Sequence, residues 1–314
     1  MDDVLVRVRP RRFPALHVGL FLATVATTLW AGFQLSPLAA RAPTLPNVVV
    51  GGLPFAASLV AILFCHEMGH YLVARRHGVF ATLPYFIPVP FGAGTLGAVI
   101  RMRSQIPSRR AALDIAAAGP LAGIVVAVPL LLWGLAHSEL RPIASSPVGS
   151  AVASPYALLR ALLAGRQLLG ADPGAQFFGD SLVTLAAARL VHGPLPPGTD
   201  LVLHPVAFAA WLGLLVTTLN LVPLGQLDGG HVMYALIGRR SALVVSRLVS
   251  WGLLAAGLFL SWNWIVWWAL TRFVLGLKHP PSLEEEPLDP ARAAVAVLSL
   301  VLFALTFIPV PVSF

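Results

Sequence analysis

The chain has 314 residues, of which 57% are hydrophobic and only 11% are charged, and its mean hydropathy is +0.82. Soluble domains carry roughly a quarter charged residues, so this composition excludes an ordinary soluble protein and favours a membrane protein. The net charge of +8 does not indicate a nucleic-acid partner, because the arginines cluster between apolar segments as the positive-inside rule requires. The single cysteine, Cys65, excludes an intramolecular disulfide.

The first half of the chain predicts three membrane spans. A basic N-terminus, 1–13, precedes an apolar segment at 14–35, which we interpret as a first span because it lacks the small-residue cleavage site of a signal peptide. Long apolar stretches predict further spans at 49–74 and 112–137. Between them, 81–106 is rich in proline and glycine, and its pieces YFIPVPF and TLGAVIRMR have strand character.

The second half begins with an interval, 138–204, that is richer in proline, serine, glycine and aspartate. We predict an extramembrane loop with two short helices, one at 156–169 and one with Asp180 as N-cap that ends near Gly193. The apolar segments that follow lie at 205–237, 241–260, 262–277 and 291–312. Whether 241–277 holds one span or two is open, and that choice decides the side of the C-terminus.

These elements predict an all-α polytopic membrane protein with about six or seven transmembrane helices. Its parts are the N-terminus 1–13, a first membrane part 14–137, the loop 138–204 and a second membrane part 205–314. With the N-terminus in the cytoplasm and alternating spans, fifteen lysines and arginines fall on the cytoplasmic side and five on the other. This bias supports the orientation.

Three ionisable residues fall within five positions of the second span, in AILFCHEMGHYLVARR. Charged groups are costly in hydrocarbon, so each is a candidate functional residue. His66 and His70 are four apart and project from one helix face at a spacing that suits a zinc ion, and Glu67 beside them is placed to act as general base. A polar cluster that merely packs between helices is the alternative.

The span at 205–237 offers a third metal ligand, Asp228, its only acidic residue, among helix-breaking proline and glycine residues. His66 and His70 precede Arg75 by nine and five residues, and Asp228 precedes Arg239 by eleven. At about 1.5 Å per residue the three residues lie at nearly matched depths.

Other polar residues near these spans allow more than one interpretation. Asn220 is a candidate donor to a substrate carbonyl or oxyanion, or else an interhelical hydrogen-bonding residue. We expect His231 at the membrane interface, with a position near the metal as the alternative. We expect Asp114 to complement a helix dipole and not to be catalytic.

HEMGH at 66–70 and NLVPLGQLDGGH at 220–231 together resemble the site-2 protease family of intramembrane zinc metalloproteases. Asn220, Pro223, Asp228 and Gly229 match the family pattern, and AGPLAG at 118–123 resembles its small-residue segment. Many members have asparagine where this chain has Gly123. No segment predicts a PDZ domain, and the chain given is too short for a C-terminal CBS pair.

The resemblance covers roughly 50–240. It implies one zinc ion per chain held by His66, His70 and Asp228, with Glu67 as catalytic base and Asn220 assisting. It also implies that 81–106 forms a membrane-associated β-hairpin or re-entrant loop whose edge strand receives the substrate. The implied activity is cleavage of a transmembrane protein substrate within the lipid bilayer, and the oligomeric state is unknown. We expect a prokaryotic inner membrane, with the site toward the cytoplasmic side.

Three rival functions remain. Another class of membrane zinc protease, such as a prenyl-protein protease, usually recruits glutamate as third ligand, and no later span here contains one. The other two are a metal-binding transporter and an inactive relative that binds membrane helices, neither of which needs Glu67.

Overall fold

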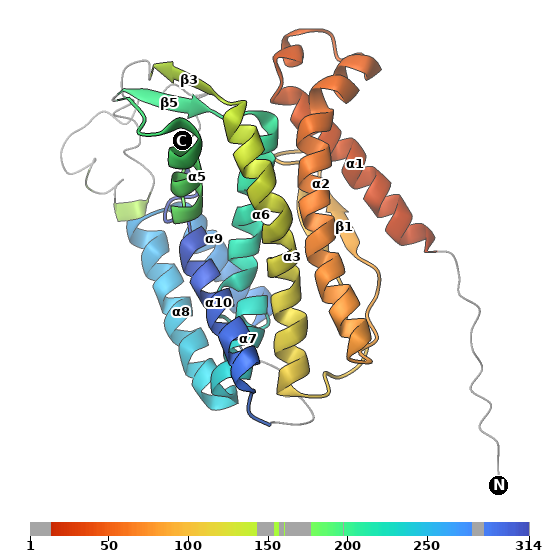
Figure 1. The fold of residues 1–314 in the computed structure, drawn as a ribbon, viewed down its shortest axis with the longest axis vertical. Coiled ribbons are helices and arrows are strands. Elements are labelled where there is room, and N and C mark those ends of the chain that lie inside the picture. The colour runs from red at the N-terminus through yellow and green to blue at the C-terminus, as the bar shows by residue number, and fades with distance from the viewer. Residues whose placement is uncertain are drawn as a thin grey trace.

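The structure is a computed structural model that describes residues 14–142, 154–156, 160, 177–196, 198–277 and 286–313. The basic N-terminus lies outside the described residues, as does almost all of the helix expected at 156–169. The described chain is mainly a bundle of helices with three small two-stranded sheets (Figure 1).

Four helices are long and apolar enough to cross a membrane: α1 (Ala15–Gln34), α2 (Leu45–Arg76), α3 (Arg109–Ala136) and α8 (Arg239–Phe259). They confirm the predicted helical membrane class and coincide with four of the expected spans. Three apolar helices are shorter: α5 (Leu182–His192), α6 (Pro205–Leu221) and α10 (Pro290–Thr306). The expectation of six or seven spans is therefore confirmed only for four helices of spanning length.

The span expected at 205–237 is not one helix. α6 ends at Leu221, a turn occupies residues 222–227, and α7 (Asp228–Ile237) begins after it. Gly225 adopts a left-handed φ of 55° in this turn, and its backbone N–H donates to the Ser246 hydroxyl over 3.2 Å. The Gly225 N–H thus has an acceptor within the protein, and irregular backbone is tolerated at membrane depth where protein groups supply such partners.

The stretch 241–277 contains two helical segments, of which only α8 is long and apolar enough to be a candidate span. α8 ends at a turn over 260–261, and α9 (Trp262–Ala269) follows it and continues as a π-helical segment at Leu270–Leu275. After α10 the chain is extended, and its strand β6 (Val312–Ser313) pairs with β4 (Phe177–Phe178). The last helix is thus shorter than the expected 291–312.

The loop between α3 and α6 has its own small elements. β3 (Glu139–Pro142) pairs with β5 (Thr199–Val202), and α5 lies between them in the sequence. The N-cap of α5 is Ser181, one residue after the predicted Asp180, because the Ser181 hydroxyl accepts the Thr184 backbone N–H. The predicted end near Gly193 is confirmed.

The strand character predicted within 81–106 is confirmed. β1 (Tyr85–Pro88) and β2 (Thr95–Val99) form an antiparallel hairpin with Tyr85 opposite Val99. The hairpin lies beside α1, where the Thr27 hydroxyl donates to the Gly94 carbonyl over 2.6 Å (Figure 1). A short 3-10 helix at Pro37–Ala40 connects α1 to α2.

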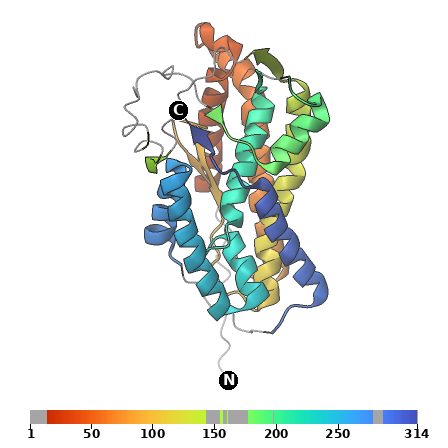
Figure 2. The ribbon, with the colours of Figure 1, turned by 90° about the vertical axis from the view of Figure 1, so that its left-hand side faces the viewer.

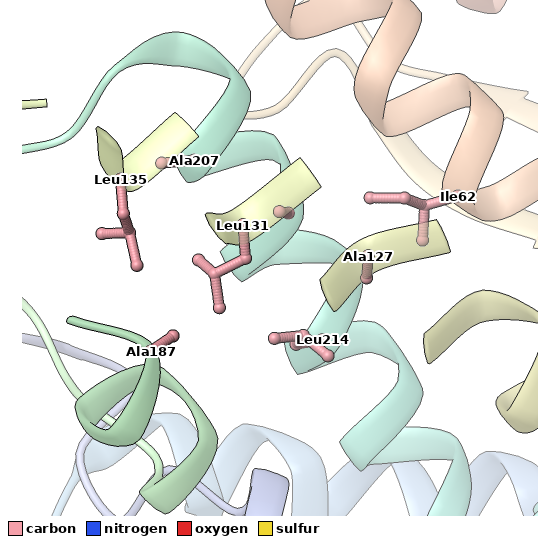
Figure 3. Packing of buried hydrophobic residues seen from close by; sticks show 8 residues of the cluster. Ile62, Ala127, Leu131, Leu135, Ala187, Ala207 and Leu214 are labelled. Atoms are coloured by element: carbon pink, nitrogen blue, oxygen red, sulfur yellow. The ribbon is translucent and has the colours of Figure 1, made fainter. Parts of the chain in front are cut away.

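The centre of the bundle is formed by α2, α3 and α6, which pack directly on one another. Both ribbon views show α3 and α6 side by side (Figures 1 and 2). Ile62, Leu131 and Leu214, one from each helix, meet in a core whose residues are less than a tenth exposed (Figure 3). Because this core is rigid, side chains projecting from α2 and from the end of α6 keep fixed relative positions.

Candidate metal centre

His66, Glu67 and His70 lie in the C-terminal half of α2 and face the interior of the bundle. Their exposed fractions are 2%, 6% and 6%. The two imidazoles stand one helical turn apart, and their Nε2 atoms are 3.2 Å from each other. Three buried ionisable groups on one helix face need partners, which the neighbouring elements supply.

Asp228, the first residue of α7, brings its carboxylate to these imidazoles. Its Oδ2 lies 3.2 Å from His70 Nε2 and 3.6 Å from His66 Nε2. The adjacent Gly229 allows this approach, because a Cβ there would overlap the carbonyl oxygen of Leu221 at the end of α6. The break between α6 and α7 therefore places Asp228 opposite α2, as the sequence motif predicted.

The spacing of these three atoms fits a tetrahedral metal ion. Zinc bonds to nitrogen and oxygen at about 2.0–2.1 Å, so ligand atoms at the corners of a tetrahedron are about 3.3 Å apart. The observed separations among His66, His70 and Asp228 are 3.2, 3.2 and 3.6 Å. Within the described residues they are the group of histidine and carboxylate side chains close enough to share an ion. A centre with three protein ligands leaves a fourth position, as in catalytic zinc sites.

α3 holds the His70 ring from behind. His70 Nδ1 lies 2.7 Å from the carbonyl oxygen of Ile115, an acceptor, so Nδ1 carries the proton and the Nε2 lone pair faces the centre. One turn later, Gly119 lies directly against the ring, and a Cβ there would overlap it. A Cβ at Gly123 would come within 3.2 Å of His66 Nδ1. Gly119 and Gly123 belong to AGPLAG, and because they lack side chains α3 can pack closely against both histidines.

Glu67 lies beside the ligand group without belonging to it. It lines the same cavity as Ile100, the residue just beyond β2. Asn220, near the end of α6, places its amide nitrogen 3.3 Å from His66 Nε2. Every residue singled out from the sequence as ligand, base or donor is thus found in one place.

A cavity of about 710 Å³ opens beside this group. Glu67, Asp228 and Asn220 line it, together with residues 98–100 and 102–106 of the segment that ends the hairpin. His231 also lines the cavity, one turn after Asp228, so its position near the ligand group agrees with the less favoured of the two interpretations. The segment that follows the hairpin borders the site, but nothing in the sequence identified Ile100 as a residue that lines the same cavity as Glu67.

Asp114 lies away from the ligand group in an ionic cluster. Its carboxylate accepts from the Arg292 guanidinium at 2.8 and 2.9 Å and lies 3.0 Å from His77 Nε2. It links α3 to the start of α10 and the end of α2. Asp114 lies outside the ligand group, as predicted, but it joins three helices and does not simply complement the dipole of its own helix.

The chain was compared with known proteins. The profile of peptidase family M50 matches residues 54–262, which include every residue of the site. Among curated relatives, the probable zinc metalloprotease EGY2 of Arabidopsis thaliana is 32% identical over 84% of this chain and 43% of its own length. EGY1 of the same plant, also named a probable zinc metalloprotease, is 29% identical over 93% of this chain and 52% of its own.

This chain spans about half the length of these curated relatives. Both are named as chloroplastic, so they give no support to the prokaryotic membrane expected from the sequence. No solved structure matches the chain significantly.

Proposed function

The chain belongs to peptidase family M50, and from this membership we propose that it is a zinc metalloprotease that cleaves a membrane-protein substrate in or near a transmembrane segment. One observation carries the proposal. Three ligand atoms with tetrahedral spacing stand beside a buried glutamate and a cavity, on helices of membrane-spanning character. His66, His70 and Asp228 are the proposed ligands of one zinc ion per chain.

Zinc bound there would supply Lewis acidity, which lowers the pKa of water and polarises a carbonyl group. Glu67 is the proposed base: it takes the proton of the attacking water and later delivers it to the nitrogen of the leaving amine. Glu67 and Ile100 line the same cavity, so the proposed base stands beside the segment that follows β2. Asn220 is placed to donate its amide to the substrate oxygen that becomes negative.

The proposed substrate segment binds in extended form. A peptide bond inside a helix is shielded by its own hydrogen bonds, so the segment must unwind before the bond can be attacked. The free edge beyond β2 borders the cavity and offers backbone groups for pairing with such a segment. In the proposed orientation the site faces the membrane side that carries the arginines at 75–76, 101–103 and 239–240, which the positive-inside rule assigns to the cytoplasm in a cell membrane.

The first experiment measures zinc in the full chain purified in detergent. We expect about one zinc per chain in wild type and a loss of zinc in His70→Ala and Asp228→Ala. His137→Ala and Asp200→Ala are matched controls, because both residues lie outside the ligand group. Wild type that is folded but binds no added zinc would contradict the proposal.

The second experiment separates a protease from the rival functions. Glu67→Gln is expected to keep its zinc and to lose cleavage of a membrane substrate by about 10²–10⁴-fold. Cleavage at the wild-type rate by Glu67→Gln would refute the role of Glu67. Metal transport across sealed vesicles by a protein that cleaves nothing would instead favour the transporter.

A further inference from the structure

The segment after β2 presents backbone groups on two sides. On one side, the Arg103 N–H donates to the Phe80 carbonyl over 2.7 Å, and the Arg101 carbonyl accepts from the Thr82 N–H over 3.0 Å. On the other side, the Ile100 backbone points away from 80–82, because the adjacent Arg101 backbone points toward them, and Ile100 lines the cavity together with Glu67. The Met102–Ala81 bridge belongs to the same antiparallel ladder, so the Met102 backbone groups also point away from 80–82. The free edge beside the site therefore consists of Ile100 and Met102.

Two arginines alternate with these edge residues. The side chains of Arg101 and Arg103 are exposed, and they share one face of the ribbon because successive side chains of a strand alternate. Arg103 lines the cavity. Neither guanidinium forms an ion pair with any residue that the structure describes. The nearby carboxylate of Asp114 is already paired with Arg292.

Ile100 and Glu67 line the same cavity, so Ile100 marks the position of the reaction along this edge. A substrate residue opposite Ile100 lies next to the catalytic base. Substrate residues opposite Arg101 and Arg103 then lie one and three positions farther along, toward the end of α2 and the start of α3. Their side chains would stand about 4.5–5.5 Å, Cβ to Cβ, from those of the two arginines.

Resting on the proposed function, we propose that this site selects substrates with acidic residues at alternate positions, i and i+2, on the N-terminal side of the cleaved bond, and that Arg101 and Arg103 bind them across antiparallel strands. Opposite charges directly across two strands stabilise their pairing, and like charges weaken it. Arg101 and Arg103 are specificity residues and touch no reacting atom. The arginines at the end of α2, Arg75 and Arg76, are also exposed but belong to a helix and not to the edge that would pair with a substrate.

The test measures binding to Glu67→Gln protein in neutral detergent, so that it does not depend on cleavage. The probes are three fluorescent peptides in which Asp-x-Asp, Asn-x-Asn or Lys-x-Lys precedes one apolar segment, because a substrate strand antiparallel to 100–103 runs in the opposite direction. We expect the Asp peptide to bind roughly 2- to 30-fold more tightly than the Asn peptide at low salt, from two cross-strand pairs, and the Lys peptide more weakly than either. The preference should shrink in 1 M salt, where the Debye length is about 3 Å.

Charge reversal provides the control. The double variant Arg101→Glu with Arg103→Glu should prefer the Lys peptide, while Arg75→Glu with Arg76→Glu should keep the wild-type order. Equal binding of all three peptides, or the same reversal in both double variants, would overturn the proposal. A wild-type protein that binds zinc and cleaves the Asn peptide as well as the Asp peptide would overturn the selectivity alone, whereas failure of the zinc experiment would overturn the proposed function.

Discussion

The substitution Gly119→Ala tests whether α3 sets the geometry of the ligand group. In the structure Gly119 faces the His70 ring, and an alanine Cβ would overlap it. The His70 ring cannot move away freely, because its Nδ1 is held 2.7 Å from the carbonyl oxygen of Ile115, which lies on α3 like Gly119. To reach ordinary van der Waals distance, the ring or the α3 backbone must move by more than about 1 Å.

A displacement of that size exceeds the tolerance of about 0.2 Å for metal–ligand distances. Changes behind metal-binding histidines typically reduce metal affinity by about 10–100-fold, which corresponds to about 1.4–2.7 kcal/mol. We expect Gly119→Ala to lose at least this much zinc affinity. The assay is competition between the detergent-purified protein and a chromophoric zinc chelator at fixed pH.

Two other glycines provide a graded series. Gly123→Ala should have a smaller effect, because its Cβ would lie 3.2 Å from His66 Nδ1 and the neighbour needs to move by only a few tenths of an ångström. Gly252→Ala on α8 should have none, because no atom lies within 4 Å of the added Cβ. A Gly119→Ala protein with wild-type folding and wild-type zinc affinity would refute the reasoning.

Three further changes test other parts of the structure. Asn220→Ala should keep its zinc but lower kcat by about 10²–10³-fold in a cleavage assay, since it removes a donor to the oxyanion; an unchanged kcat would make Asn220 a packing residue. Asp114→Asn should reduce stability by about 1–3 kcal/mol, measured as a lower thermal midpoint in detergent, because it weakens charged hydrogen bonds to Arg292, whereas Glu139→Gln in an exposed pair should change little. Hydrogen bonds from the Arg292 backbone and guanidinium hold the pKa of Asp289 below its usual range, so its contribution is present above the unfolded pKa of about 3.9 and is lost as the pH falls below it. The protection of the Arg292 and Ala293 amides against hydrogen exchange, relative to the intrinsic rate at each pH, should therefore fall in acid. Protection that does not change with pH would argue against this cap.

Several features followed from the sequence because their causes are local. Long apolar runs predicted α1, α2, α3 and α8, and the His66–His70 spacing placed two imidazoles on one helix face. The helix-breaking residues around Asp228 predicted the interruption between α6 and α7, though not that α7 would be a separate helix. Strand character within 81–106 predicted the hairpin, because alternation and glycine turns are also local properties.

Other features depended on which helices pack together. The sequence placed Asp114 at a helix start, but its partner Arg292 is 178 residues away and only the packing of α10 on α3 joins them. His231 faces the cavity and not the interface, because the turn at 222–227 sets the rotation of α7.

The membrane class, the types of the candidate metal ligands and their approximate depth could be predicted from the sequence, since these depend on composition and on spacing along single helices. The packing of separate elements, in contrast, sets the 3.2–3.6 Å distances between the ligand atoms, places Gly119 against His70 and brings Ile100 to the cavity that Glu67 lines. Those contacts join α2 to α3, α7 and the hairpin, and a distance between separate elements is set by the packing of the whole core, which no local pattern encodes.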